Sequence, residues 1–529
     1  MIKPSIFLTL ILVVVLFTSC KKESEKRLIH FPPTDLTQEP LIPIPLSTTA
    51  FRGGFALDDF TVIKTNQEIE TTQKVAEFLA DKIHSKTGLT LPVNENDDSS
   101  ITSIIYVNES ETDYLNGPEA YELIIKSDSL ILNTNSSEGA FRGIQTIRQL
   151  IPTISNDTLA ENPIWVIPTG KIIDRPRFEY RGNMLDVARH FFDVEDLKKY
   201  IDVLSYYKLN HLHLHLSDDQ GWRIEIKSWP KLTEIGGSTE VGGESGGFYT
   251  QEEFLEIIEY AASRFITIIP EIDMPGHTNA ASASYPFLNG NGKTPELYEG
   301  MKVGFSTLNT RKDTVYTFID DVVREISALI PGPYFHIGGD ESHVTKKEDY
   351  IYFVDRVEKI VQKHGKQMIG WDEISNTNID NTSIVQFWAS MENAKTAASK
   401  NMKIVLSPAQ KAYLDMKYDS AAIFGLNWAG YIPTDTAYIW DPKSYLPEEH
   451  ILGIEAPLWS ETISTISELE YLAFPRVIGY AELGWSNQEN REWQDYKMRL
   501  AHQSYFLDRM NINYYRSPLI DWPKKDHIN

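Results

Sequence analysis

Two adjacent carboxylates, Asp340 and Glu341, are the residues of this sequence best suited to acid–base chemistry. They follow the pair Gly338–Gly339 and the apolar residues Tyr334–Phe335. A glycine pair lets the backbone turn tightly, so a strand ending here would present both carboxylates at its carboxyl end. An isolated Asp-Glu pair is usually solvated surface, but this position favours function. Such a pair could protonate a leaving group and stabilise developing charge.

Other predicted strand ends carry acids, an arginine and tryptophans. These segments are Asp186–Arg189, Ser217–Gln220, Glu271–His277, Trp371–Glu373, Trp388 and Trp459–Glu461. Sugar rings stack on tryptophan while their hydroxyl groups bond to charged side chains. The combination therefore indicates a sugar site.

The elements that must position these residues alternate between strand and helix from Arg181 onward. Strands are expected at 182–187, 210–216, 265–272, 334–337, 367–371, 384–388, 402–406 and 452–459, and helices at 194–207, 250–264, 314–329 and 350–364. About eight β/α units predict an α/β fold, a (β/α)8 TIM barrel over residues 173–529, with reacting groups at the carboxyl ends of its strands.

A small α/β domain of sheet and helices is expected before the barrel, over residues 46–172. Short β-like runs lie at 104–107, 121–125 and 130–132, and helical patterns at 71–87 and 137–150. The second helix places Ala140, Ile144 and Ile147 on one face.

The first twenty residues predict a lipoprotein signal. Lys3 precedes an apolar run from Ile6 to Phe17, which is shorter than the roughly 20 residues of a membrane span. The run leads to Cys20, the only cysteine, which would be lipidated and become the mature N-terminus. Phe17 departs from the usual Leu, and an ordinary signal or a core cysteine is the alternative. Residues 21–45, with five prolines, predict a tether.

Composition limits the partners. Acidic residues number 74 against 50 basic ones, for a net charge of −24, which disfavours nucleic acid. A single cysteine excludes a thiolate zinc cluster. With the lipid anchor at Cys20, we expect a bacterial cell-envelope protein facing the periplasm or the outer surface.

Several motifs, in this order, resemble glycoside hydrolase family 20, the β-N-acetylhexosaminidases. His336–Glu341 looks like the family signature, and the similarity includes residues 181–192, 213–223, 273–277 and 455–461, with the helix from Glu138 resembling the end of the family's N-terminal domain. The resemblance spans about 480 residues. It implies exo-hydrolysis, without a cofactor, of terminal β-linked GlcNAc or GalNAc from oligosaccharides or glycoconjugates.

The resemblance implies a retaining, substrate-assisted mechanism. The 2-acetamido oxygen would attack the anomeric carbon and form an oxazolinium intermediate that water opens. Glu341 would act as general acid and then base, Asp340 would accept the acetamido N–H, and Tyr413 would donate to the acetamido oxygen. Asp218 and His277 would form a relay that tunes Glu341.

The same resemblance implies a set of substrate-binding residues. Trp371, Trp388 and Trp459 would enclose the acetamido methyl and the sugar face, Arg189 would bind the 3- and 4-hydroxyls, Glu461 the 4-hydroxyl, and Asp415 the outer hydroxyls. The residues alone leave alternatives open. Trp371 and Trp388 could be barrel core, Tyr413–Asp415 a plain loop, and Arg189 an ion-pair partner. The motif favours Asp218 over Asp219 without deciding between them.

Two other function classes compete with this interpretation. His211, His213 and His215 alternate along one strand, as in metal-dependent amidohydrolase barrels. Among the later histidines only His277 and His336 belong to predicted barrel strands or their ends, so we expect no catalytic metal. The second alternative is a glycan-binding lipoprotein without catalysis, against which the intact Asp340, Glu341, Tyr413 and Arg189 argue.

Overall fold

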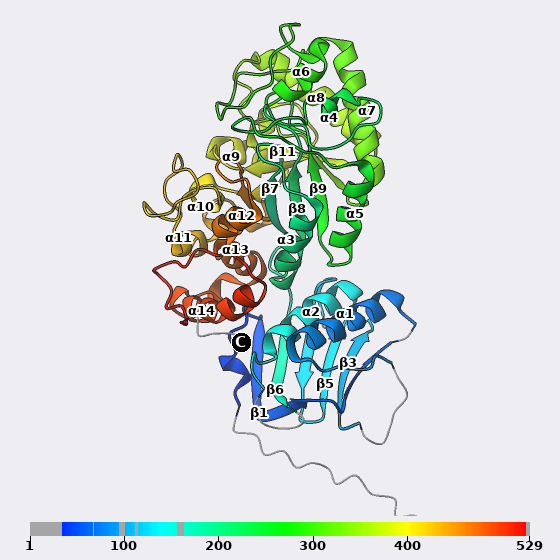
Figure 1. The fold of residues 1–529 in the computed structure, drawn as a ribbon, viewed down its shortest axis with the longest axis vertical. Helices are drawn as coiled ribbons and strands as arrows, with labels where there is room; N and C mark the ends of the chain where they lie inside the picture. The colour runs from blue at the N-terminus through cyan, green and yellow to red at the C-terminus, as the bar shows by residue number, and fades with distance from the viewer. Residues whose placement is uncertain (1–33, 67, 95–100, 112–114, 156–162, 525–529) are drawn as a thin grey trace, which may run out of the picture.

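The computed structural model describes residues 34–66, 68–94, 101–111, 115–155 and 163–524, which form a six-stranded sheet domain and a closed barrel (Figure 1). The predicted signal and Cys20 lie outside these residues. Within the described residues, no helix is both long and apolar enough to cross a bilayer.

The sheet domain has its strands in the order β1-β6-β4-β5-β3-β2. They are β1 (Ser47–Leu57), β2 (Thr61–Thr65), β3 (Ser103–Glu109), β4 (Tyr121–Ile125), β5 (Ser129–Thr134) and β6 (Trp165–Asp174). Helices α1 (Glu70–Thr87) and α2 (Ser137–Leu150) cover the sheet on the side toward the barrel (Figure 1). The structure adds β1, β2 and β6 to the predicted strands. The patterns of two of them are interrupted, since β1 has a register shift between Ala50 and Gly54 and β6 contains Pro168.

The barrel closes in the order β10-β11-β12-β13-β14-β7-β8-β9, and each strand is parallel to its neighbours. Its strands are β7 (Tyr180–Asp186), β8 (His211–His215), β9 (Thr267–Glu271), β10 (Tyr334–His336), β11 (Gln367–Trp371), β12 (Ile384–Phe387), β13 (Lys403–Leu406) and β14 (Ile451–Leu458). All eight fall where the sequence predicts a strand, so the TIM-barrel prediction is confirmed.

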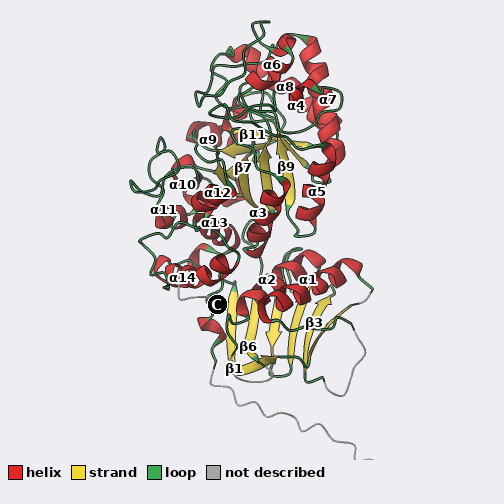
Figure 2. Ribbon diagram, viewed as in Figure 1, coloured by secondary structure: helices red, strands yellow, loops and turns green. Residues whose placement is uncertain are grey.

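Helices surround the barrel strands (Figure 2). They are α3 (Val194–Tyr206), α4 (Lys231–Glu234), α5 (Gln251–Ala262), α6 (Asn279–Ser284), α7 (Asp313–Leu329), α8 (Lys347–Lys363), α9 (Met391–Ser399), α10 (Ala409–Ala412), α11 (Thr434–Tyr438), α12 (Ile466–Ala473), α13 (Arg476–Trp485) and α14 (Trp493–Arg509). Capping fixes several starts. Asp193 caps α3, and Thr250 and Glu253 form a capping box at α5.

The described part of the predicted tether, residues 34–45, is packed against the protein. Leu41 and Ile42 are buried, and Gln149 of α2 bonds both the N–H and the C=O of Ile42. Arg499 of α14 donates to the Leu41 carbonyl at 2.8 Å. The proline-rich composition suggested an extended free segment, but its apolar side chains find cover between α2 and α14.

A buried ion cluster joins the sheet domain to the amino end of the barrel. Glu119 accepts from Arg142 of α2 at 2.7 Å and from Arg181 of β7 at 2.9 Å. Arg142 also donates to the Phe265 carbonyl just before β9. Burial raises the pKa of Glu119, but the two guanidiniums outweigh it and lower the pKa to about 2. The predicted site residues lie at the other end of the barrel, where the strands have their carboxyl ends.

We expect Glu119→Ala to destabilise the protein by about 3–5 kcal/mol, because two buried guanidiniums lose their anion. The measurement is the thermal unfolding midpoint, with Glu195→Ala, which removes an exposed partner of Lys198, as the control. Since the folded pKa of Glu119 is depressed to about 2, its contribution is complete above the ordinary pKa and is lost as pH falls from about 4.5 toward 2. An equal change in both variants would contradict this role.

Candidate active site

The adjacent carboxylates lie in a tight turn directly after β10. Gly338 and Gly339 have φ of +67° and +98°, and Glu341 itself has φ of +44°. A positive φ is costly for a residue with a Cβ, so the surrounding contacts must hold Glu341 in place. The Gly338 N–H donates to Nδ1 of His336 at 3.0 Å, and the Gly339 N–H donates to Asp273 at 3.0 Å. These bonds fix the turn.

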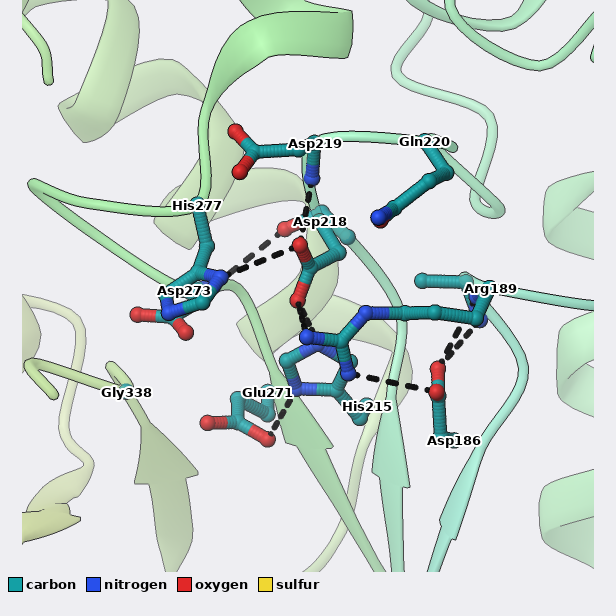
Figure 3. A network of polar contacts seen from close by, with 12 residues as sticks. Asp186, Arg189, His215, Asp218, Asp219, Gln220, Glu271, Asp273, His277 and Gly338 are labelled. Atoms are coloured by element: carbon teal, nitrogen blue, oxygen red, sulfur yellow. Dashed lines mark hydrogen bonds and ion pairs between the residues drawn. The ribbon is translucent and has the colours of Figure 1, made fainter. Parts of the chain in front are cut away.

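His277, from the loop after β9, lies between Asp218 and the carboxylate pair, and its contact with Asp218 is drawn in Figure 3. Its Nδ1 donates to Asp218 Oδ1 at 3.1 Å, and its Nε2 lies 3.6 Å from Glu341 Oε2 and 3.8 Å from Asp340 Oδ2. Burial lowers the pKa of His277, but the charges of Asp218, Asp273 and Asp340 raise it well above its usual range. An imidazole with a raised pKa thus faces both predicted catalytic carboxylates.

The choice that the sequence left open between Asp218 and Asp219 is decided by their partners. Asp218 contacts His215, His277 and Arg189. Asp219 instead accepts from the Asn279 N–H and the Ser306 hydroxyl, which fasten the neighbouring loops. Asp218 is therefore the member of the pair that lies in the relay.

Arg189, after β7, is held by two buried carboxylates. It lies 3.2 Å from Asp186 and 2.8 Å from Asp218, and its guanidinium sits 4.9 Å from the ring centroid of Trp459. Its Nε is buried without a hydrogen-bond partner among the described residues. Arg189 thus forms ion pairs, as the alternative interpretation expected. These ion pairs place its guanidinium beside Trp459, one of the aromatic residues predicted to bind sugar.

Four predicted residues form a continuous aromatic wall. Ring centroids are 5.8 Å apart for Trp371 and Trp459, 6.2 Å for Trp459 and Tyr413, and 6.3 Å for Tyr413 and Trp388. Trp371 is almost fully buried and packs in the hydrophobic core of the barrel domain. It is therefore part of the core, the alternative that the sequence left open, as well as part of this wall. Trp388 is half-buried and lies nearly parallel to Tyr413, at 17°.

Three predicted residues carry buried carboxylate oxygens without a hydrogen-bond partner among the described residues. They are Asp340 Oδ1, Asp415 Oδ1 and Glu461 Oε2. Burial of such acceptors is unfavourable unless a ligand or water completes them. Burial and the charge of Glu461 raise the pKa of Asp415 well above its usual range. Oxygens of this kind suit the hydroxyl and amide donors of a sugar.

The two catalytic candidates have opposite pKa shifts. Burial and the charge of Asp273 raise the pKa of Asp340 well above its usual range. Burial also raises the pKa of Glu341, but His277, whose Nε2 lies 3.6 Å from Glu341 Oε2, outweighs it and leaves the pKa lowered. These directions are the reverse of those that a general acid at Glu341 and an ionised Asp340 would need, so the shifts do not assign the two roles.

The histidines of the metal alternative lie inside the barrel. His211 stacks on Tyr180 at 4.1 Å, and His213 Nδ1 bonds Glu455 at 3.0 Å. Donor atoms of His213, Glu271 and His336 are close enough to hold an ion. However, Glu271 accepts the Trp371 indole N–H and His336 Nδ1 accepts the Gly338 N–H, so these groups already serve as hydrogen-bond partners. The geometry favours a structural network.

Three residues near the site were not assigned to it from the sequence. His215 and Glu271 extend the relay beyond Asp218. The alternation of histidines along β8 hinted at His215, and the position of Glu271 at the end of a predicted strand marked it without giving it a role. Trp428, with 56% of its surface exposed, stands 5.8 Å from Tyr413 and 6.3 Å from Trp388 at the rim of the wall. It lies in a loop, where no periodic pattern marks it.

A cavity of about 630 Å³ lies elsewhere, between α1, α2 and α14. Its lining includes Lys86, Arg148, Tyr206 and Arg509, and none of the predicted site residues. The chemistry and this cavity are therefore separate features.

Together, a (β/α)8 barrel, paired carboxylates and a histidine relay at its strand ends, and an adjoining aromatic wall define the class of barrel glycoside hydrolases.

Comparison with known proteins agrees. Residues 178–488 match the model of the glycosyl hydrolase family 20 catalytic domain, and residues 38–174 match domain 2 of the same family. The chain belongs to glycoside hydrolase family 20. It is 39% identical to a β-N-acetylhexosaminidase of Cellulomonas fimi over 427 residues, 80% of this chain and 85% of that protein. It is 32% identical to a β-hexosaminidase of Akkermansia muciniphila, over 75% of this chain and 86% of that protein.

Solved structures are similar over nearly the whole chain. The family 20 β-N-acetylhexosaminidase of Streptomyces coelicolor A3(2) is 43% identical with a TM-score of 0.87, covering 93% of this chain and 100% of that one. A mutant Streptomyces plicatus β-hexosaminidase in complex with product GlcNAc is equally similar, at 43% identity and a TM-score of 0.87, covering 93% and 99%.

Proposed function

We propose that this protein is an exo-acting β-N-acetylhexosaminidase that removes terminal β-linked GlcNAc or GalNAc from oligosaccharides or glycoconjugates. The observation that carries the proposal is the pair Asp340 and Glu341 on one strand end, both within 4 Å of His277 Nε2. Neighbours on one strand end can address the glycosidic oxygen and the 2-substituent of the same sugar. Family membership and the named relatives support this activity.

The proposed reaction uses the substrate's own acetamido oxygen as nucleophile. Glu341 gives a proton to the glycosidic oxygen. The imidazole of His277 beside it, whose pKa is raised, can supply a proton to that carboxylate. Asp340 accepts the acetamido N–H, and the positive charge that develops on the oxazolinium favours its ionised form. Glu341, ionised after the transfer, then takes a proton from the water that opens the ring.

The remaining predicted residues hold the sugar. Tyr413 donates to the acetamido oxygen, and Trp371, Trp388 and Trp459 position the acetamido group and sugar face for attack. Arg189, Asp415 and Glu461 bind the hydroxyl groups, and the unpartnered oxygens of the two acids suit this role.

The function is tested by nitrophenol release from the β-GlcNAc, β-GalNAc and β-glucose aryl glycosides. We expect turnover of the first two and little of the glucoside, because glucose lacks the acetamido nucleophile. Comparable turnover of the glucoside would refute substrate assistance. Binding of GlcNAc without release of nitrophenol would instead favour a non-catalytic glycan-binding protein.

Metal removal separates the proposal from the amidohydrolase alternative. We expect activity to survive exhaustive EDTA treatment, because the mechanism uses carboxylates and a histidine and the barrel histidines bond to protein groups. The assay compares EDTA-treated enzyme with and without added zinc. Loss of activity that zinc restores would support the metal alternative.

We further propose that Cys20 anchors the enzyme to a bacterial membrane, facing the periplasm or the outer surface. The apolar run before Cys20 and the charged residues after it support this proposal. We expect labelled palmitate to be incorporated into the wild-type protein and not into Cys20→Ala, which should move to the soluble fraction. An anchored Cys20→Ala protein would contradict the proposal, and Ser19→Ala serves as the matched control.

A further inference from the structure

We infer that Glu271 is a positioning residue. It orients both the relay of Asp218 and His277 and the aromatic wall of the site. The inference rests on the proposed function, and Glu271 is not itself expected to touch the substrate. Glu271 is the last residue of β9 and is fully buried. Inside the barrel a carboxylate is costly unless its hydrogen bonds are satisfied.

One oxygen of Glu271 supports the aromatic wall. Oε1 accepts the indole N–H of Trp371 at 3.0 Å, which ties the end of β11 to the end of β9. Trp371 has one polar atom, and this bond fixes the rotation of its ring. Since the centroid of Trp371 is 5.8 Å from that of Trp459, a rotated Trp371 would disturb the wall where the acetamido group is proposed to sit.

The other oxygen supports the acid relay. Oε2 accepts from Nδ1 of His215 at 2.6 Å, and Nε2 of the same ring bonds Asp218 Oδ2 at 2.8 Å (Figure 3). Asp218 in turn holds His277, whose Nε2 faces Glu341. Glu271 therefore stands at the start of a chain of contacts that ends at the proposed general acid. Two more histidines complete its surroundings, with His213 Nε2 and His336 Nδ1 each 3.0 Å from a Glu271 oxygen.

The two halves of the site are thus coupled through one carboxylate. Removing Glu271 frees the indole of Trp371 and leaves His215 without the bond that orients its ring toward Asp218. A displacement of about 1 Å in a reacting group can cost about 100-fold in rate. A side chain that only filled the core would affect stability without a matching effect on both substrate binding and turnover.

The experiment compares Glu271→Leu with Glu271→Gln in hydrolysis of the nitrophenyl β-GlcNAc glycoside. Leucine removes both bonds, and we expect kcat/KM to fall about 100-fold, with a raised KM from the loosened Trp371 and a lowered kcat from the loosened relay. Glutamine keeps the shape. Its amide oxygen can accept the indole N–H, and its amide N–H can donate to Nδ1 of a neutral His215 that still donates to Asp218. We expect Glu271→Gln to retain activity within about tenfold.

Double-mutant cycles assign the two effects. The KM effect of Glu271→Leu should be largely absent in a Trp371→Phe background, which lacks the indole N–H. Its kcat effect should be largely absent in a His215→Asn background. Additive effects in both cycles would overturn the inference.

A matched control separates position from stability. Glu482 is also a fully buried carboxylate, bonded to Arg499, Tyr438 and the Ile44 N–H, none of which is a predicted site residue. We expect Glu482→Gln to lower the unfolding midpoint while leaving kcat and KM within about threefold of wild type. If Glu271→Leu behaves like this control, the positioning role is wrong. If the wild-type protein itself releases no nitrophenol, the proposed function fails instead.

Discussion

Glu341→Gln should lower kcat for a β-GlcNAc-terminated disaccharide by about 10²–10⁴-fold, because the amide can neither give a proton to the leaving oxygen nor take one from water. The loss should be smaller for the nitrophenyl glycoside, since nitrophenolate leaves without protonation. For the nitrophenyl glycoside the remaining loss of kcat comes from the second step, in which the variant has no base to activate water. GlcNAc release measured from both substrates gives the two values.

The fold should be unaffected, because the Glu341 side chain is 26% exposed and its turn is fixed by backbone bonds. Glu348→Gln, an exposed acid at the start of α8, serves as the control, with activity equal to wild type. Wild-type rates on the disaccharide in Glu341→Gln would remove this residue from the acid role and leave Asp340 as the candidate.

Asp340→Asn should lower kcat on the nitrophenyl β-GlcNAc glycoside by about 10²–10³-fold. Asparagine has the size of aspartate, but it has no negative charge to stabilise the oxazolinium and can present an amide N–H where an acceptor is required. The burst of nitrophenol and the steady-state rate together measure the loss at this step.

The same substitution should leave the unfolding midpoint unchanged or raised. Burial and the charge of Asp273 hold the pKa of Asp340 well above its usual range, which means that the ionised carboxylate is unfavourable in the empty site. Activity and stability should therefore move in opposite directions. A change in kcat below threefold would contradict the proposed role of Asp340.

Much of the barrel could be predicted from the sequence because its signals are local. Apolar runs such as Ile384–Phe387 are buried on both faces, and residues that follow them must lie at the carboxyl ends of parallel strands. This rule brings Arg189, Asp218, His277 and Glu341 to one end of the barrel although 152 positions separate the first from the last, since 341 − 189 = 152. The identity of the family followed from the same segments.

Only the tertiary structure shows which residues contact one another when they are distant in the sequence. Asp218 and Asp219 are chemically the same. The structure shows that Asp218 contacts Arg189 and His277 in the relay, whereas Asp219 accepts a hydrogen bond from Ser306 in a neighbouring loop. The packing of Leu41 and Ile42 between α2 and α14 contradicts the composition of a free tether, because burial depends on surfaces supplied hundreds of residues away.

The sequence by itself determined the barrel, its reacting ends and the pair Asp340–Glu341, since strand periodicity and a glycine turn act over a few residues. Only the tertiary structure revealed that Glu271 contacts both His215 and Trp371. The physical reason is that a hydrogen bond between strands is set by barrel closure and register. These bring His215 of β8 to 2.6 Å and Trp371 of β11 to 3.0 Å from Glu271 of β9, and the sequence of a single strand does not specify such pairings.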